Sequence, residues 1–432
     1  MQERKTLNQH LSRNIELGIT FCLSAFYLGI NLPSPIPSAL ALLSFLIIPL
    51  LIIRQWKKFI YVATRDIPLI LAVAIAVISV LWSTNPEETL AHSRALLFST
   101  AFGIYLATRY TPKEQMRLMV WLFGTYMFLC LVTPLIVPSY GTDINTEGLS
   151  WQGIAGHKNA LSAAMGLAAT LFLDLALYGY KYRRIVSLGA GISFILIVLS
   201  KGKGGLAVFI ALLPLLPLYK LAKQEYRLRT FFSVFAFAIA LVMIVATLLN
   251  LEFITVELLG KDVELTGRIP LWNYLIQRGM EKSWLGYGYG AFWTNSQETL
   301  LVALNVPWMS AIADGTTKAH AHSAYIDLFL QLGWVGVSLV TLSFMTLLFR
   351  VVLLLGLTRQ IEYLWMLQLL IFMALGNIAN NAGEFLAYRS LYWVLYVSTA
   401  CSTAVHLKRI LKTGNKLENL QYENTTYQHQ RS

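Results

Sequence analysis

Basic residues and histidines lie close together in four short polar segments of this sequence. The segments are Gly156-His157-Lys158-Asn159, the glycine-rich run at 200–205, the stretch at 268–293 that Arg268 opens, and His320-Ala321-His322. An Arg side chain can hold a phosphate group with two parallel hydrogen bonds, and a Lys side chain adds a point charge. A neutral His, with an ordinary pKa of about 6.5, can remove a proton from a sugar hydroxyl. Cations beside a histidine therefore favour sugar transfer from a donor that carries a pyrophosphate.

The elements that position these segments are predicted to be membrane helices. Apolar residues make up 56% of the 432 residues and charged residues 13%, which excludes a disordered chain and argues against a soluble one. A membrane-spanning helix needs about 20 apolar residues. The sequence predicts about twelve such helices, at residues 15–31, 38–53, 67–82, 94–108, 117–137, 159–179, 185–200, 205–219, 230–250, 334–357, 362–380 and 388–406.

The distribution of basic residues predicts how these helices are oriented. The formal net charge is +12, but the basic residues stand in short runs between apolar segments, as in membrane proteins rather than nucleic-acid-binding ones. Arg4, Lys5 and Arg13 precede the first helix, so we expect it to be a signal anchor with a cytoplasmic N-terminus. Threading the chain from there places 24 of the 34 Lys and Arg residues on the cytoplasmic side, and the C-terminus with them. The ten outward residues are Arg94, Lys158, Lys201, Lys203, Lys261, Arg268, Arg278, Lys282, Lys318 and Arg389.

The predicted fold is therefore an all-α membrane protein with one large outward loop. Helices at 1–250 precede a periplasmic loop at 251–333, which is followed by helices at 334–406 and a cytoplasmic tail at 407–432. Residues 322–333 are too few to cross a bilayer and mix apolar residues with Asp327 and Gln331, so they predict an amphipathic helix in the membrane interface. The GYGYG run at 286–290 indicates close packing or a re-entrant bend.

Five motifs follow one another in the order found in a known family. They are LWSTNPEETLAHSRALL (81–97), GHKNALS (156–162), the hairpin at 200–203, GRIPLWNYLIQ (267–277) with LGYGYGAFW (285–293), and HAHSAYIDLFLQLGWVG (320–336). This set resembles the O-antigen ligase and polymerase family of bacterial envelope enzymes, which includes exopolysaccharide polymerases. The resemblance implies a transferase of the inner membrane, without metal or other cofactor, that takes glycan from an undecaprenyl-pyrophosphate carrier on the periplasmic face. Its partners would be the carrier-linked oligosaccharide, a glycan or lipid A core acceptor, the bilayer and, in some systems, a chain-length regulator.

The resemblance also implies a role for individual residues. His322 corresponds to the family's general base, Arg268 to its donor-binding arginine and Lys203 to its second cation. Further donor-binding cations are expected at Lys201, Lys158 and Arg94, and supporting residues at His320, Asn159 and Tyr325. The chain departs from the family at two positions, because Gly202 replaces a serine and Ser323 replaces an asparagine.

Several of these residues have simpler explanations. His322 could cap the helix that follows it, Arg268 could pair with Asp262 or Glu264, and the lysines of the 200–203 hairpin could contact lipid headgroups. A divalent metal bound by Asp314, His320 and His322 is a further alternative, since alternate residues of an extended strand point the same way.

Two other functions compete with a polymerase. A ligase of the same family would use lipid A core as acceptor, and the sequence favours the polymerase only through the look of the motifs at 81–97 and 156–162. A transporter or lipid flippase would carry out no chemistry. Transporters of this size usually show two related halves and ionisable residues at mid-membrane, and this sequence shows neither.

Overall fold

The computed structural model describes residues 2–145, 148–179, 182–221, 268–306, 309, 319–379 and 384–429. Within these ranges the chain is almost entirely helical, which confirms the all-α class. The exception is an antiparallel hairpin of β1 (Thr142–Asn145) and β2 (Gly148–Trp151).

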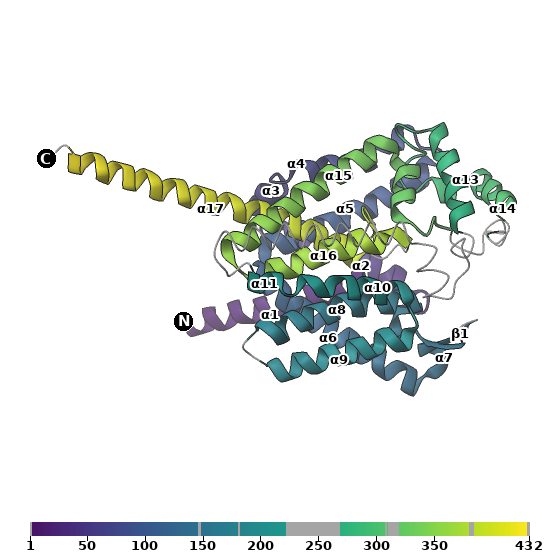
Figure 1. The fold of residues 1–432 in the computed structure, drawn as a ribbon, viewed down its shortest axis with the longest axis horizontal. Coiled ribbons are helices and arrows are strands. Elements are labelled where there is room, and N and C mark those ends of the chain that lie inside the picture. The colour runs from purple at the N-terminus through teal and green to yellow at the C-terminus, as the bar shows by residue number, and fades with distance from the viewer. Residues whose placement is uncertain are drawn as a thin grey trace.

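Long helices run side by side along the bundle in Figure 1. They are α1 (Gln2–Leu28), α2 (Ile36–Ile53), α4 (Ile67–Ile78), α5 (Pro86–Arg109), α6 (Pro112–Ile136), α8 (Lys158–Tyr178), α9 (Arg183–Ser200), α10 (Lys203–Leu212), α15 (Ala324–Thr358), α16 (Ile361–Ala379) and α17 (Leu391–His429). Shorter helices connect or cover them: α3 (Trp56–Ala63), α7 (Pro138–Gly141), α11 (Leu218–Leu221), α13 (Arg268–Glu281) and α14 (Ser296–Asn305). Both labelled termini lie at one end of the bundle, and α13 and α14 lie at the other.

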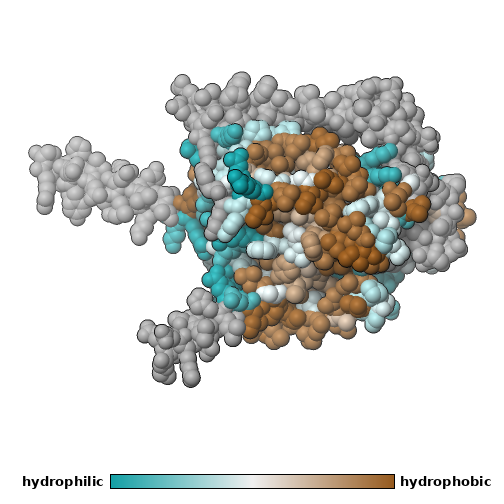
Figure 2. Space-filling model, turned by 90° about the horizontal axis from the view of Figure 1, so that it is seen from below, coloured by the Kyte–Doolittle hydropathy of each residue, from teal (hydrophilic) through white to brown (hydrophobic). Residues whose placement is uncertain are grey.

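Six of these helices are long and apolar enough to cross a membrane: α2, α6, α8, α9, α15 and α16. The bent pair of α3 and α4 would be a seventh, and α10 with the 3-10 turn after it, Lys203–Leu215, is apolar but shorter. On α2, Leu42, Leu46 and Leu50 are 65%, 66% and 68% exposed, a stripe suited to lipid. Figure 2 shows a broad apolar band between two more hydrophilic ends. The predicted helix at 230–250 lies outside the described residues, so a total of twelve stays a prediction.

Among the six, α8 is the most enclosed, with 78% of its apolar window buried. It packs against α9, α10, α16 and α6. Its sequence is rich in Ala, Ser and Gly, and small residues let membrane helices approach closely. A Cβ atom added at Gly166 would lie 3.4 Å from the carbonyl oxygen of Gly205 on α10. Helices α8 and α10 therefore pack closely against each other.

Helix α15 is broken at Gly333, which adopts φ 58° and ψ −162°. The break separates a short helix at 324–332 from the long apolar part, at the position where the sequence predicts the interfacial helix to end. A Cβ atom at Gly333 would collide with the backbone of Trp284, so a larger residue could not follow this path.

The chain at 283–288, which includes the first part of the GYGYG segment, forms backbone hydrogen bonds with the residues around the break. These bonds are Tyr287 N–H to Leu330 O (2.8 Å), Gly288 N–H to Gln331 O (3.0 Å), Trp334 N–H to Ser283 O (2.8 Å) and Val335 N–H to Trp284 O (3.1 Å). Gly286, Gly288 and Gly290 all have positive φ, and a Cβ atom at Gly286 would lie 2.5 Å from the Gln331 carbonyl carbon. The GYGYG run thus packs closely against the chain around Gln331, as the sequence predicts.

The end of the bundle opposite the termini has a small hydrophobic core of its own. Its buried residues come from α13, α14, the GYGYG segment and the chain around α15's start: Leu271, Leu275, Tyr287, Phe292, Val302, Ala303, Val306, Met309, Ala321 and Leu330. Because Ala321 belongs to this core, the neighbouring histidines are fixed relative to α13.

Candidate functional site

His322 stands just before α15 in a left-handed backbone conformation, with φ 54°. Its backbone N–H donates to Nδ1 of His320 (3.1 Å), and the two imidazole rings are 4.0 Å apart at their centroids. The N-cap position of α15 belongs to Ser323, so His322 does not occupy the capping position that the simpler explanation requires.

Burial and positive charge shape the electrostatics of these histidines. Burial, together with the charges of His320, Arg268 and His157, lowers the pKa of His322 to about 3. The pKa of His320 is lowered by burial and by the charges of Arg268 and His157. Both imidazoles are therefore neutral near pH 7, the form in which a ring nitrogen can accept a proton.

Arg268 is the first residue of α13 and is half-buried, and burial lowers its pKa. An arginine nevertheless remains charged. One turn later, the indole Nε1 of Trp272 donates to the carbonyl oxygen of Ala321 (2.8 Å), which ties α13 to the histidine segment. The alternative partners Asp262 and Glu264 lie outside the described residues.

Two lysines stand at the first positions of neighbouring helices. Lys158 begins α8, where Nδ1 of the N-cap residue His157 accepts the backbone N–H of Asn159 (3.2 Å). Lys203 begins α10, and the hydroxyl of Ser162 on α8 donates to the carbonyl oxygen of Gly202 just before it (2.7 Å). The positive ends of two helix dipoles, each with a lysine, therefore lie side by side.

The same contact accounts for the glycine at 202, where the family has a serine. A Cβ atom there would lie 2.8 Å from the Ser162 Oγ and 3.1 Å from the Lys158 carbonyl oxygen. Any side chain at position 202 would collide with α8, so the close approach of α8 and α10 requires glycine.

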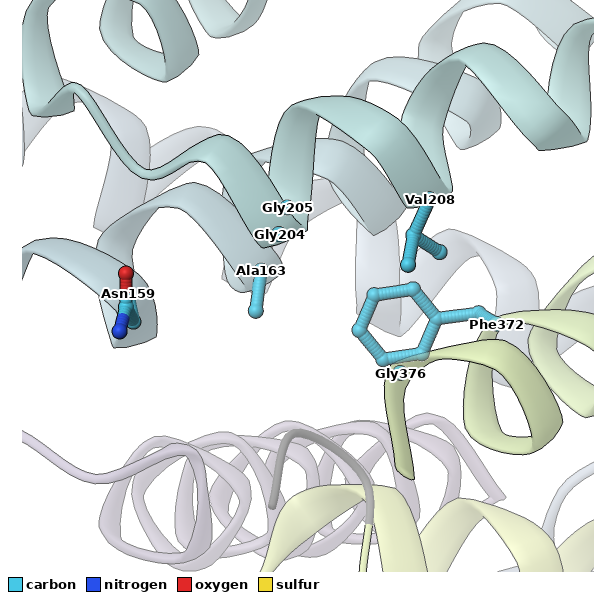
Figure 3. Close-up of a pocket in the computed structure, with 7 residues that line it drawn as sticks. All are labelled: Asn159, Ala163, Gly204, Gly205, Val208, Phe372 and Gly376. Carbon is cyan, nitrogen blue, oxygen red and sulfur yellow. The ribbon is translucent and has the colours of Figure 1, made fainter. Parts of the chain in front are cut away.

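The end of α16 joins the lysine segment to the histidine segment. A small pocket between α8, α10 and α16 is lined by Asn159, Ala163, Gly204, Gly205, Val208, Phe372 and Gly376 (Figure 3). Around this end of α16, the Tyr325 hydroxyl donates to the Ala374 carbonyl oxygen (2.8 Å) and the Ser323 hydroxyl to the Asn377 carbonyl oxygen (3.5 Å). Tyr325 thus bonds to α16, and Asn159 lines the pocket that α16 closes.

Two predicted donor-binding residues, Lys201 and Arg94, lie on segments that do not contact the histidine segment through the bonds described above. Lys201 is exposed and left-handed (φ 54°), and its Nζ lies 3.4 Å from a Cβ atom placed at Gly148 in the hairpin. Arg94 is exposed on α5, which packs chiefly against α17. No contact among the described residues joins Arg94 to Arg268 or His322, so its proposed role has no geometric support.

The alternative of a divalent metal bound by Asp314, His320 and His322 has only two of its three ligands in the part of the chain that the structure describes. No group of three His, Cys, Asp or Glu side chains there is arranged to hold a metal ion. The third suggested ligand, Asp314, lies outside the described residues.

Sequence reasoning missed the residues that hold the histidine segment. Asp327 and Gln331 were expected on an amphipathic helix, but Asp327 is 2% exposed and the Gln331 Oε1 accepts the Gly290 N–H (2.9 Å). Trp272 and Trp293 were not singled out either. The available signal was Asp327 within the apolar helix at 324–332. A carboxylate buried there needs hydrogen-bond donors around it, and the indole N–H groups of nearby tryptophans can supply them.

Residues 188–341 match the family model described as O-antigen ligase. The match runs from α9 into α15 and includes Lys201, Lys203, Arg268, His320 and His322. It supports the family that the ordered motifs indicated, and with it a membrane glycan ligase or polymerase as the general class. No curated protein matches the chain.

Proposed function

We propose that this chain, with its O-antigen ligase match at residues 188–341, is a glycan polymerase of the bacterial inner membrane. It would transfer glycan from an undecaprenyl-pyrophosphate carrier to a sugar hydroxyl on the periplasmic face. The observation that carries the proposal is the neutral imidazole of His322 beside the charge of Arg268, at the end of the bundle opposite the termini.

His322 would act as the general base. One of its ring nitrogens takes the proton of the acceptor hydroxyl as that oxygen attacks the anomeric carbon of the donor sugar. The bond between the anomeric carbon and the phosphate oxygen breaks, and undecaprenyl pyrophosphate leaves with the electron pair. The proton then passes from His322 to solvent or to the departing phosphate. Attack from the face opposite the leaving group inverts the anomeric configuration.

The donor itself would make His322 a stronger base. Burial and neighbouring positive charge lower the pKa of this histidine. A bound pyrophosphate brings negative charge close to Arg268 and offsets part of that effect, so the pKa of His322 should rise when the donor binds. His322 would then be a stronger base in the complex with the donor than without it.

The cations would bind and stabilise the leaving group. Arg268 offers a planar fork for two phosphate oxygens. Lys203 and Lys158, each at the positive end of a helix, add charge where negative charge develops as the bond breaks. Lys201 and Arg94 belong to this proposal only as outer contributors.

A ligase is the second candidate, because the matching family model is described by that activity. The two differ in the acceptor, which is another lipid-linked glycan for a polymerase and lipid A core for a ligase. The matched family does not itself support a chain-length regulator as partner.

The test is a reconstitution in detergent. Purified protein is mixed with lipid-linked repeat units extracted from a host that lacks this chain, with and without lipid A core. Longer lipid-linked glycans, formed equally in the presence of a chelator, are expected of a metal-independent polymerase, and His322→Ala should not form them. Product on lipid A core alone would identify a ligase. A transporter would leave no product in detergent, so unchanged glycans under all conditions would refute the enzymatic proposal.

A further inference from the structure

The peptide groups on either side of Ala321, which lies between the two histidines, are both held by side chains. On one side, the Ala321 N–H lies 3.2 Å from each carboxylate oxygen of Asp327. On the other side, the Ala321 carbonyl oxygen accepts from the Trp272 indole (2.8 Å). The segment before His322 is thus fixed from two directions.

Asp327 is itself held in place. It lies in the first turns of α15, is 2% exposed, and its Oδ1 accepts the indole Nε1–H of Trp293 (2.6 Å). Nearby Glu384 has its pKa raised to about 8 by burial and by the charge of Asp327, so Glu384 holds a proton near pH 7.

The conformation of His322 explains why such a clamp is needed. A left-handed backbone is unfavourable for a non-glycine residue, and it persists only where surrounding contacts determine it. Here those contacts come from three segments: Trp272 on α13, Trp293 after the GYGYG run and Asp327 on α15. Since Arg268 lies one turn before Trp272, the same clamp sets the place of the imidazole relative to the donor-binding arginine.

We propose that Asp327 is a positioning residue for the general base, acting through the Ala321 peptide to hold His322 at the reacting hydroxyl, with Trp272 as its counterpart. This inference rests on the proposed function of His322. Asp327 touches neither substrate and takes no proton. Its effect is on the rate of the chemical step, because a misplaced base loses proton transfer while the donor is still bound by Arg268.

Asp327→Asn and Trp272→Phe test the clamp, with Trp284→Phe as the matched control. The asparagine has one acceptor oxygen where the aspartate has two, and its amide N–H would face an N–H donor. We expect turnover to fall about 10- to 100-fold in Asp327→Asn and about 3- to 10-fold in Trp272→Phe. Binding of undecaprenyl pyrophosphate should stay within about threefold. Trp284 is 73% exposed, and its change to Phe should leave both quantities unaltered.

A double-mutant cycle with His322→Ala separates positioning from a general structural role. If Asp327 acts only through His322, the double variant is no slower than His322→Ala alone. The inference would be overturned if the two substitutions reduced turnover independently, so that their fold-losses multiplied in the double variant. A parallel loss of undecaprenyl pyrophosphate binding, or wild-type turnover in Asp327→Asn, would overturn it too. If Asp327→Asn does not fold, the cycle of Trp272→Phe with His322→Ala decides in the same way. Glycan elongation that survives His322→Ala would contradict the base assignment, which is a distinct failure.

Discussion

At the end of the bundle that carries both termini, two arginines are bonded to acidic side chains, whereas around Ala321 at the opposite end two histidines stand beside the positive charge of Arg268. Arg109 holds Glu16 with two hydrogen bonds, from Nε (2.8 Å) and Nη2 (3.0 Å). Arg350 pairs with the fully buried Asp66. At the other end, Arg268 lowers the pKa of both His320 and His322.

The difference indicates two uses of charge. Opposite charges in contact stabilise the bundle, since removing one partner leaves a buried charge uncompensated. At the opposite end, the positive charge of Arg268 stands beside two neutral histidines, and the hydrophobic core around Ala321 fixes the segments that carry them. Such a site is suited to an anionic ligand, whose charge would offset that of Arg268.

Removing the imidazole should have the largest effect. His322→Ala is expected to lower turnover about 10²- to 10⁴-fold, the contribution usual for a general base, with little change in donor binding. His322→Asn is the matched variant, because Asn tolerates a left-handed backbone but is no base. Steady-state kinetics and undecaprenyl pyrophosphate binding would measure the two quantities. Equal losses in both would show that the histidine binds or folds instead of catalysing.

Breaking a pair at the terminal end should act on stability and not on chemistry. Asp66→Ala should lower the free energy of unfolding by about 3 kcal/mol, because it leaves Arg350 without this carboxylate. Asp66→Asn keeps an acceptor for the Leu69 N–H (3.0 Å) and should cost less. Thermal unfolding in detergent measures the loss. A fall in turnover per folded molecule would contradict the division between the two ends.

Arg268→Lys should weaken donor binding by about 1.5–3 kcal/mol, because the charge stays but the bidentate fork is lost. The control is Arg278→Lys on the same helix, where the arginine bonds to Glu298 (2.8 Å). That change should leave the affinity for undecaprenyl pyrophosphate unaltered. Equal affinity in Arg268→Lys and wild type would place Arg268 outside the donor site.

A further effect is expected in the pH dependence of stability. Folding lowers the pKa of His322 to about 3, so between about pH 6.5 and that value the unfolded chain binds more protons than the folded one. The free energy of unfolding should therefore decrease as the pH falls through this interval. Unfolding midpoints at about pH 7 and about pH 4.5, compared between wild type and His322→Asn, measure the contribution. Identical acid sensitivity in the two proteins would argue against a depressed pKa.

Some features of this molecule are predicted by the local sequence pattern, and others depend on contacts between residues far apart in the chain. The apolar segments located the helices, and Gly333 broke α15 where the twelve-residue segment at 322–333 was expected to end. The order of the motifs indicated the family that residues 188–341 match. In contrast, the requirement for glycine at 202 depends on Ser162, forty residues earlier, and could not be seen from the hairpin alone.

The sequence by itself indicated an all-α membrane protein, the family that residues 188–341 match and the types of side chain available for chemistry, because hydrophobicity and motif order are properties of the chain read locally. Only the tertiary structure decided that α13 is tied to the histidine segment and α10 to α8, and that Asp327 turns inward to hold the Ala321 peptide. Burial and the meeting of distant segments set the pKa of His322 and the conformation of its backbone. These depend on packing between helices, which spacing along the chain does not record.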